Sequence, residues 1–409
     1  MKTISFITLG CRANQAETEL MKDIAEKKGF SIIGPKEKAD IIVINTCTVT
    51  SLADRKSRAT IRASIRRKAK KIIVTGCLAD TDIDEIKQIN GVDVILTNKE
   101  KASFNKHLPQ ILKHNTTKRK INVRDNLIIQ TGCNNFCTYC IVPYARGRET
   151  DYDHEKILSQ AKRMASKGIK ELILTGTNTG AYNKLPLLLN DLSKIEDIKR
   201  IRLSSIEPFN ISQELVDSII ENPKVCRHLH IPLQNGSDKI LEKMNRKYSR
   251  DDFYKMTQYL KMLLPDIAIT TDIIVGFPGE TEEDFEDTLH LVNKIKFNKI
   301  HIFKYSKRKG TPASEMKGQT DPRISENRSK QLQTLGKEIS RKHHEKLMGQ
   351  TVEVLIENKN KKNELLEGLT GNYIRVFMKG DVNNIGNIVK IQVMNTKPEY
   401  VTGSFLMCH

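Results

Sequence analysis

Three cysteines in the first part of the chain occupy the same place in a repeated pattern. The apolar segments 4–9, 41–44 and 72–74 are followed closely by Cys11, Cys47 and Cys77. Continuous apolar runs separated by stretches suited to helices predict a buried parallel sheet. Because parallel strands end at one edge of a sheet, where open α/β folds bind ligands, the three thiols should converge in space. The pattern therefore predicts an α/β fold for this part of the chain.

Helices and one further strand complete this predicted unit, which spans residues 1–115. Residues 15–28 and 53–70 are expected to be helices, and residues 92–96 a fourth strand. The next stretch, residues 113–126, is polar and basic and is expected to be a linker. Its cations are Lys113, Lys118, Arg119, Lys120 and Arg124.

The three strand-end thiols suit an iron–sulfur cluster. Thiolates are ligands for soft metals, and a four-iron cluster usually takes four of them. Three ligands would leave one iron open. The alternative is three separate structural cysteines, since free cysteine is often buried. Three at the same structural position favour the cluster.

A second set of three cysteines lies within eight residues. Cys133, Cys137 and Cys140 are spaced Cys-x3-Cys-x2-Cys, and His154 is the nearest further ligand in the sequence. A structural zinc site would need a fourth ligand, which does not follow closely. A four-iron cluster held by three thiolates keeps one iron open for a small ligand. The spacing therefore favours a second cluster over a zinc knuckle.

Strand and helix patterns alternate after this loop and predict a partial β/α barrel. The expected strands are residues 171–174, 201–203, 229–231, 268–275 and 299–303. The expected helices are residues 152–167, 212–221, 237–244, one that begins near residue 281, and 322–346. The active face of such a barrel lies at the carboxyl ends of its strands. This unit, with its linker, is expected to span residues 116–348.

The tail, residues 349–409, changes character and predicts a small β-barrel. Short strands with glycine turns are expected at residues 351–356, 373–377, 388–393 and 401–406. Barrels of this kind often bind nucleic acid, although the fold alone does not establish it.

The charge of the chain favours a polyanionic partner. Lys and Arg number 68 against 49 Asp and Glu, which gives a formal net charge of +19. RNA, DNA and an anionic membrane would all satisfy it. Four arginines of the predicted helix 53–70 share one face by their spacing, namely Arg55, Arg58, Arg62 and Arg66. Such a run is either a solvated face or a phosphate-binding face.

The first residues and the apolar runs of the chain predict a cytoplasmic location without membrane attachment. The first residues form too short an apolar run for a signal peptide and offer no cleavage site. No apolar run approaches membrane-spanning length.

The loop of residues 132–140 resembles the signature of the radical S-adenosylmethionine (SAM) superfamily. In that superfamily the open iron binds the methionine part of SAM, and one electron cleaves SAM to a 5′-deoxyadenosyl radical. The resemblance implies SAM contacts at Tyr139, Thr175, Gly176, Gln234, Ile274 and Gly276. Loop packing, an ordinary turn and a helix start at Thr281 are the simpler explanations for these residues.

The whole chain resembles the methylthiotransferases. The segments that carry the resemblance are residues 8–11, 45–50, 75–77 and 132–147. It implies a methylthiotransferase domain, a radical SAM domain and a TRAM domain in that order. It also implies two 4Fe–4S clusters, an auxiliary one on Cys11, Cys47 and Cys77 and the SAM cluster on Cys133, Cys137 and Cys140. A reductant protein of the flavodoxin or ferredoxin type would supply electrons.

Four further segments resemble the branch that acts on N6-threonylcarbamoyladenosine at position 37 of tRNA, beside the anticodon. They are residues 47–50, 55–58, 225–230 and 269–272. The implied reaction adds a methylthio group to C2 of that base in the anticodon loop. Two sister branches remain as alternatives, one acting on isopentenyladenosine 37 and one on an aspartate of a ribosomal protein. A non-enzymatic RNA-binding protein is a third, but it would not need six clustered cysteines.

The threonylcarbamoyl group carries a carboxylate and a hydroxyl, so its pocket should offer a cation and hydrogen-bond donors. Arg202, Arg227 and Arg246 are candidate cations, and the sequence does not choose among them. One departure concerns residues 148–151, Arg-Glu-Thr-Asp, where the family often has a Ser-Arg pair. No catalytic residue is assigned from the sequence.

Overall fold

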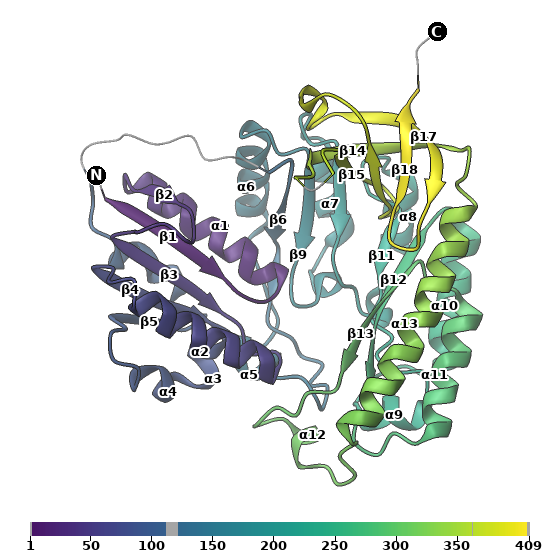
Figure 1. Ribbon diagram of the computed structural model, residues 1–409, viewed down its shortest axis with the longest axis horizontal. Coiled ribbons are helices and arrows are strands. Elements are labelled where there is room, and N and C mark those ends of the chain that lie inside the picture. The colour runs from purple at the N-terminus through teal and green to yellow at the C-terminus, as the bar shows by residue number, and fades with distance from the viewer. Residues whose placement is uncertain (1, 112–121, 362, 407–409) are drawn as a thin grey trace.

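The computed structural model describes residues 2–111, 122–361 and 363–406. It has an N-terminal α/β part, a central barrel of parallel strands and a C-terminal β-barrel (Figure 1). The predicted boundary near residue 115 and the linker cations Lys113, Lys118, Arg119 and Lys120 lie outside the described residues.

The first sheet has five parallel strands in the order β2-β1-β3-β4-β5. Their bounds are β1 Thr3–Thr8, β2 Ser31–Ile33, β3 Ile41–Thr46, β4 Lys71–Gly76 and β5 Val94–Leu96. All six residues of β3 are buried, as a central strand of a doubly covered sheet requires. The predicted α/β fold is confirmed. Only β2 was not expected, because three residues are too few to show a pattern.

Helices cover both faces of this sheet. They are α1 Arg12–Lys27, α2 Ser51–Ile65, α3 Cys77–Thr81, α4 Ile83–Lys87 and the 3-10 helix η1 Glu100–His107. The prediction of a helix to residue 70 is wrong at its end. Arg66 caps α2 and Lys68 takes a φ of 54°. The chain turns there because β4 begins at Lys71.

The central part is a partial barrel of parallel strands, as predicted. The strands are β6 Arg124–Ile128, β9 Glu171–Thr175, β10 Arg200–Leu203, β11 His228–His230, β12 Ala268–Val275 and β13 Lys299–Lys304. They form two ladders, β6-β9-β10 and β11-β12-β13, which the parallel bridges Ile201–Val225 and Ser205–His230 connect. The linker prediction is wrong at Arg124, which begins β6.

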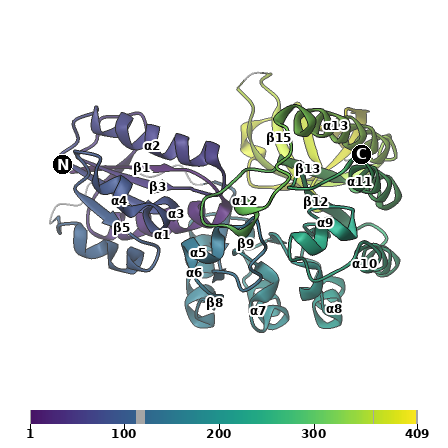
Figure 2. The same cartoon turned by 90° about the horizontal axis from the view of Figure 1, so that it is seen from below.

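An arc of helices surrounds these strands when the molecule is seen from below (Figure 2). Its members are α6 His154–Ser166, α7 Leu185–Ser193, α8 Gln213–Glu221, α9 Asp238–Lys243, α10 Arg250–Leu263, α11 Glu282–Ile295 and α13 Pro322–Glu345. Shorter elements are β7 Gln130–Thr131, α5 Val142–Arg146, β8 Thr150–Asp151, η2 Thr179–Ala181, η3 Pro208–Asn210 and α12 Pro312–Glu315.

Alternate residues of the barrel strands face different surroundings. Leu229, Ile269 and Ile273 belong to the large apolar core beneath the helices. Because side chains alternate along a strand, His230 and Asp272 face the barrel interior instead. A β/α barrel usually fills its interior with apolar side chains. The polar interior wall of this barrel therefore indicates a binding site rather than a packed core.

The tail is a closed barrel with strand order β14-β15-β16-β18-β17. Its elements are β14 Thr351–Lys359, β15 Leu366–Thr370, β16 Arg375–Met378, η4 Val382–Asn384, β17 Ile388–Thr396 and β18 Val401–Phe405. The predicted small β-barrel is confirmed. β15 was not expected, and the strand expected from residue 373 begins at Arg375 because Tyr373 has a φ of 71°.

None of the helices within the described ranges combines the length and apolar character needed to cross a bilayer.

Candidate active site

The structure places the first three cysteines at the carboxyl edge of the first sheet. Cys11 is the N-cap of α1, Cys47 follows β3, and Cys77 is the first residue of α3. A Cβ built on Gly10 would lie 2.6 Å from the Cys47 sulfur, so that thiol packs beside the residue that precedes Cys11. The three thiols, far apart in the sequence, share one corner of the molecule.

Gly76 makes this approach possible. Its φ is +97°, and a Cβ there would lie 2.3 Å from the carbonyl oxygen of Thr46. Only glycine tolerates both the left-handed conformation and the close backbone approach. The end of β4 can therefore lie directly against the end of β3, which positions Cys77 near Cys47.

The second three cysteines lie on a closed loop that follows β7. The Cys133 N–H donates to the Gly147 carbonyl at 3.1 Å, and the Cys140 N–H donates to the Cys137 carbonyl at 2.9 Å. Gly132 has a φ of +75°, and a Cβ there would lie 2.0 Å from the Arg148 carbonyl oxygen. The backbone of the loop thus holds the three thiols on one short segment.

Thr138 anchors this loop to the far side of the barrel. Its N–H donates to the Met244 carbonyl at 3.1 Å, and its hydroxyl donates to the Lys243 carbonyl at 2.8 Å. Its carbonyl accepts a hydrogen bond from the Ala313 N–H at 2.8 Å. His154, the nearest further ligand in the sequence, is instead bonded to Asp191 at 3.0 Å.

The donor chemistry of both sets fits iron–sulfur clusters. Burial raises the pKa of Cys47 and of Cys133 to about 11 and that of Cys140 to about 12. Thiols of this kind ionise only when a metal replaces the proton. In the part of the chain that is described, no three Cys, His, Asp or Glu side chains are grouped tightly enough for one metal ion. Three thiolates without a fourth ligand suit a four-iron cluster, which can bind one thiolate at each of three irons, better than a closed zinc site.

A buried arginine contacts one of the loop cysteines. Arg246 donates from Nη1 to the Cys137 sulfur at 3.2 Å and from Nε to the Tyr248 hydroxyl at 2.9 Å. It also pairs with the Glu207 carboxylate. Arg246 is therefore committed to the cysteine loop, and its assignment as a substrate cation is not supported.

Four of the predicted SAM residues lie together beside the loop. Tyr139 packs edge-on against Phe277 with ring centroids 6.5 Å apart, and Ile274 belongs to the same apolar cluster. The Ile274 N–H donates to the Gln234 carbonyl at 2.8 Å. The Gly276 N–H donates to Glu280 Oε2 at 2.6 Å, so this group is already satisfied by the protein.

Thr175 and Gly176 end β9 on the other side of the interior. The Thr175 hydroxyl is bonded to Asn126 Oδ1 at 3.3 Å and to the Ile173 carbonyl at 3.1 Å. A Cβ on Gly176 would lie 2.8 Å from Gln130 Oε1. At this edge the side chain of Thr175 is therefore bonded within the protein, and Gly176 packs closely against Gln130.

A second buried arginine fastens the two cysteine sets to each other. Arg146, at the end of α5, donates to Asn14 Oδ1 at 2.5 Å and to Glu17 Oε1 at 2.7 Å. Asn14 in turn donates to the carbonyls of Leu9 and Thr46, each at 2.8 Å. The segment that follows the cysteine loop is thus tied to the strand ends that carry Cys11 and Cys47.

The barrel interior between these sites carries a polar cluster that was not predicted from the sequence. His230 Nδ1 lies 2.9 Å from Thr270 Oγ1, and His230 Nε2 lies 3.2 Å from Asp272 Oδ1. The rings of His230 and His301 are 5.6 Å apart, and His228 Nε2 lies 3.0 Å from Thr270 Oγ1. The available signal was the alternation of polar and apolar residues along β11, β12 and β13.

The other two candidate cations are also excluded. Arg202 is buried, pairs with Glu171 at 2.8 Å and donates to the carbonyls of Thr370 and Gly371. Arg227 is exposed and pairs with Asp266 at 2.8 Å. The first serves the contact with the C-terminal barrel, and the second lies at the amino-terminal end of β11.

Three family models match successive parts of the chain. "Uncharacterized protein family UPF0004" matches residues 3–97, "Radical SAM superfamily" matches residues 127–292, and "TRAM domain" matches residues 345–406.

Proteins similar over nearly the full length carry two substrate names. The threonylcarbamoyladenosine tRNA methylthiotransferase MtaB of Bacillus subtilis (strain 168) is 37% identical over 99% of this chain and 97% of that protein. The protein of the same name from Aquifex aeolicus is 37% identical over 95% of this chain and 100% of its own length. A tRNA-2-methylthio-N(6)-dimethylallyladenosine synthase of Pelotomaculum thermopropionicum is also 37% identical, over 98% and 97%. This chain belongs to the radical SAM tRNA methylthiotransferase family.

Membership of the family makes this protein an enzyme of tRNA modification, with SAM and two 4Fe–4S clusters as cofactors. Among solved structures, the radical SAM methyltransferase TsrM of Kitasatospora setae superposes with a TM-score of 0.59 at 13% identity, over 77% of each chain. That likeness supports the fold.

Most of the arginines on the predicted face of α2 are exposed and unpaired within the described ranges. Arg55, Arg62 and Arg66 are exposed and have no carboxylate partner within the described ranges, whereas Arg58 pairs with Glu85 at 2.8 Å. At the position of the family's Ser-Arg pair, Arg148 stacks over Phe136 at 4.4 Å and Glu149 is bonded to Asn134. Both residues therefore brace the cysteine loop.

Proposed function

We propose that this enzyme transfers a methylthio group to C2 of N6-threonylcarbamoyladenosine at position 37 of tRNA. In this proposal Cys11, Cys47 and Cys77 hold the auxiliary 4Fe–4S cluster. Cys133, Cys137 and Cys140 hold the cluster that binds SAM. The base to be modified enters the barrel interior between the two sets.

The observation that carries the choice of substrate is the polar wall formed by β11, β12 and β13. His230, Thr270, Asp272 and His301 place hydrogen-bonding groups where an isopentenyl substituent would need an apolar surface. A threonylcarbamoyl group presents a hydroxyl, a urea-like linkage and a carboxylate, which all require polar partners. Similar proteins with either substrate name are 37% identical to this chain. The polar wall supports the threonylcarbamoyl substrate in this proposal.

When bound, the clusters and SAM supply the electron, the 5′-deoxyadenosyl radical that removes hydrogen from the substrate carbon, and the methyl and sulfur groups. The protein's own residues orient these reactants. Tyr139, Ile274 and Phe277 offer an apolar surface for the adenine of SAM, and the backbone of Gln234 borders it. The Arg246 guanidinium donates to the Cys137 sulfur, and Arg146 sets the distance between the two cysteine sets.

The partners follow from charge and chemistry. Arg55, Arg62 and Arg66 provide exposed positive charge for phosphates of the anticodon arm, with Arg58 beside them. Cleavage of SAM requires electrons one at a time, so a flavodoxin- or ferredoxin-type reductant is the proposed donor. The enzyme acts on tRNA in the cytoplasm in this proposal.

Mass spectrometry of host tRNA nucleosides, with and without this gene, tests the proposal. Loss of the gene should remove 2-methylthio-N6-threonylcarbamoyladenosine and leave its unmodified precursor. Loss of the methylthio isopentenyl nucleoside instead would assign the enzyme to the sister branch. Unchanged tRNA with an unmodified ribosomal protein aspartate would overturn the RNA substrate.

A further inference from the structure

One interior cation has no carboxylate partner. Arg12 is the first residue of α1 and directly follows Cys11. Its Nη2 donates a hydrogen bond to the Tyr373 hydroxyl at 3.3 Å, and within the described ranges it forms no ion pair. By contrast, Arg146 and Arg246 are each neutralised by a glutamate. A partly buried guanidinium without a counter-charge is suited to an anionic ligand.

Open space lies beside this guanidinium. Arg12 lines a cavity of about 380 Å³ together with Gln15, Asn126 and Ile173, the last two from barrel strands β6 and β9. Carboxylates of Glu19 and Asp125 line the same cavity. Arg12 also donates to the Tyr373 hydroxyl, and the Tyr373 ring stacks on His228, which places the guanidinium beside the barrel interior as well.

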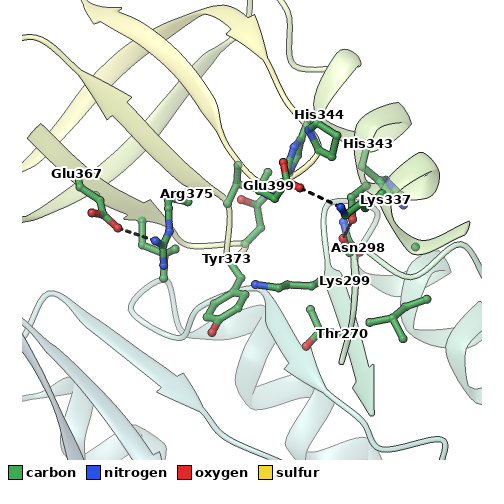
Figure 3. Close-up of a pocket in the computed structure, with 18 of the residues that line it drawn as sticks. Thr270, Asn298, Lys299, Lys337, His343, His344, Glu367, Tyr373, Arg375 and Glu399 are labelled. Atoms are coloured by element: carbon green, nitrogen blue, oxygen red, sulfur yellow. Dashed lines mark hydrogen bonds and ion pairs between the residues drawn. The ribbon is translucent and has the colours of Figure 1, made fainter. Parts of the chain in front are cut away.

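Tyr373 reaches this interior from the C-terminal barrel. It lies on the turn between β15 and β16 and points away from that barrel toward the radical SAM strands, with Lys299 and Thr270 beside it (Figure 3). Its ring stacks on His228 with centroids 4.4 Å apart and an interplanar angle of 13°. Its φ of 71° is unusual for an aromatic residue, and such strain is common at functional sites.

Cations from several elements surround Tyr373, among them Lys299 at 5.9 Å and Arg202 at 5.3 Å from its ring centroid. Burial raises the pKa of Tyr373, but Arg12, Arg124, Lys299 and Arg202 outweigh burial and lower it below its ordinary value. Burial and the charge of Arg202 hold the pKa of His228 well below its usual range, so this ring stays neutral at pH 7. Arg202 and Arg124 are paired with carboxylates, whereas Arg12 is not, so an anion could bind Arg12 without displacing an ion pair.

We propose that Arg12 binds the carboxylate of the N6 substituent of the substrate base, with Tyr373 as a positioning residue that holds the guanidinium from the C-terminal barrel. This assignment rests on the proposed function. It gives each domain a part in the pocket, since Arg12 belongs to the first, His230 and His301 to the second, and Tyr373 to the third. It also places the group that reads the substituent next to Cys11.

The test compares two substrates on one preparation of cluster-loaded enzyme. One is a tRNA carrying N6-threonylcarbamoyladenosine, and the other is the same tRNA with that carboxylate converted to its methyl ester. Loss of a hydrogen-bonded charge should lower kcat/KM of the wild type for the ester about 10- to 100-fold. Arg12→Gln should show a similar fall in kcat/KM for the tRNA with the free carboxylate. Its kcat/KM values for the acid and the ester should differ by less than about 3-fold. Arg12→Lys should recover part of the preference for the acid over the ester.

Binding and control measurements accompany the rates. The dissociation constant of each tRNA should show the same loss of acid preference in Arg12→Gln, independently of turnover. Tyr373→Phe should raise KM for the acid a few-fold while kcat stays unchanged. Arg227→Gln removes an equal charge from a paired surface arginine and should keep the wild-type preference. Because the acid-to-ester ratio is internal to each preparation, incomplete cluster loading of a variant does not alter it.

Two results would overturn the assignment in distinguishable ways. Full acid preference in Arg12→Gln, with threonylcarbamoylated tRNA still modified, would refute the role of Arg12 and leave the proposed function intact. Modification of isopentenylated tRNA alone by the wild type would refute the proposed function, and the role of Arg12 with it.

Discussion

The two cysteine sets reach similar donor chemistry by different routes. Cys133, Cys137 and Cys140 lie on one loop, which its own backbone hydrogen bonds close. Cys11, Cys47 and Cys77 come from three strand ends and meet only because the sheet forms. The first site is therefore a property of a short segment, and the second is a property of a folded domain. Disturbing the fold should damage the second site before the first.

Each set also has one buried arginine, and the two arginines do different work. Arg246 contacts a cysteine sulfur directly, within the barrel. Arg146 contacts Asn14 and Glu17 across the boundary between the first domain and the barrel. The loop site is thus supported locally, whereas the relation between the sites depends on contacts across a domain boundary, with the buried Arg146–Glu17 pair among them.

The largest effect is expected from removing either set completely. Replacing Cys133, Cys137 and Cys140 with Ala should halve an iron content of about eight atoms, since each cubane has four. It should abolish both 5′-deoxyadenosine and methylthio product, measured by liquid chromatography and mass spectrometry. Replacing Cys11, Cys47 and Cys77 should also halve the iron and abolish the methylthio product, but SAM cleavage should persist. Stoichiometric zinc, or loss of all iron from one triple variant, would contradict two independent clusters.

Next in size is the effect of breaking the ion pair between the domains. Arg146→Ala leaves the Glu17 carboxylate buried beside Lys101 alone, and should lower the free energy of unfolding by about 3–5 kcal/mol. Arg163→Ala is the matched control, because Arg163 pairs with Asp23 across the same boundary but is partly exposed. That change should cost less than about 1 kcal/mol. Equal losses in chemical denaturation would show that burial does not distinguish these pairs.

Acid should weaken the same boundary. Burial opposes ionisation of Glu17, but Lys101 and Arg146 outweigh it and lower its pKa from 4.5 to about 2. A lowered folded pKa stabilises the protein above pH 4.5, and this contribution, about 3 kcal/mol, is lost as pH falls toward 2. In chemical denaturation of the metal-free protein, the free energy of unfolding should therefore fall as the pH is lowered from 4.5 toward 2. Glu17→Gln should weaken this dependence of the free energy of unfolding on pH. An unchanged dependence in that variant would assign the acid sensitivity to other groups.

Two glycines give the smallest and most local comparison. Gly76→Ala should cost about 1–3 kcal/mol of stability and lower iron at the strand-end set, because of its φ and the clash with Thr46. Gly132→Ala should lower iron at the loop set and leave the first sheet intact. Gly168→Ala is the control, with a φ of +95° and no neighbour within 4 Å of the added Cβ. If Gly132→Ala lost iron equally from the loop set and the strand-end set, the loop set would not be the independent local site described here.

The sequence was sufficient wherever the signal lay within one segment. The strand-end cysteines, the loop cysteines and the order of the three domains follow from repeated local patterns, and the fold agrees with them. The end of α2 at Ile65 was missed because the turn into β4, not the preference of the basic residues, stops the helix.

The pocket was harder to predict because no one segment contains it. Arg12, His230 and Tyr373 come from three domains, and their meeting depends on how the domains dock. The three arginines proposed from the sequence were reasonable by charge, but the structure shows each already paired. Burial and pairing, which decide whether a cation is available, are properties of the folded chain.

The most direct test of this account offers both tRNAs in one reaction. Cluster-loaded enzyme, SAM, a reductant and sulfide are mixed with equal amounts of threonylcarbamoylated and isopentenylated tRNA, and the nucleosides are then resolved by mass spectrometry. The polar interior wall predicts 2-methylthio-N6-threonylcarbamoyladenosine as the dominant product. Methylthiolation of the isopentenylated tRNA alone would contradict it.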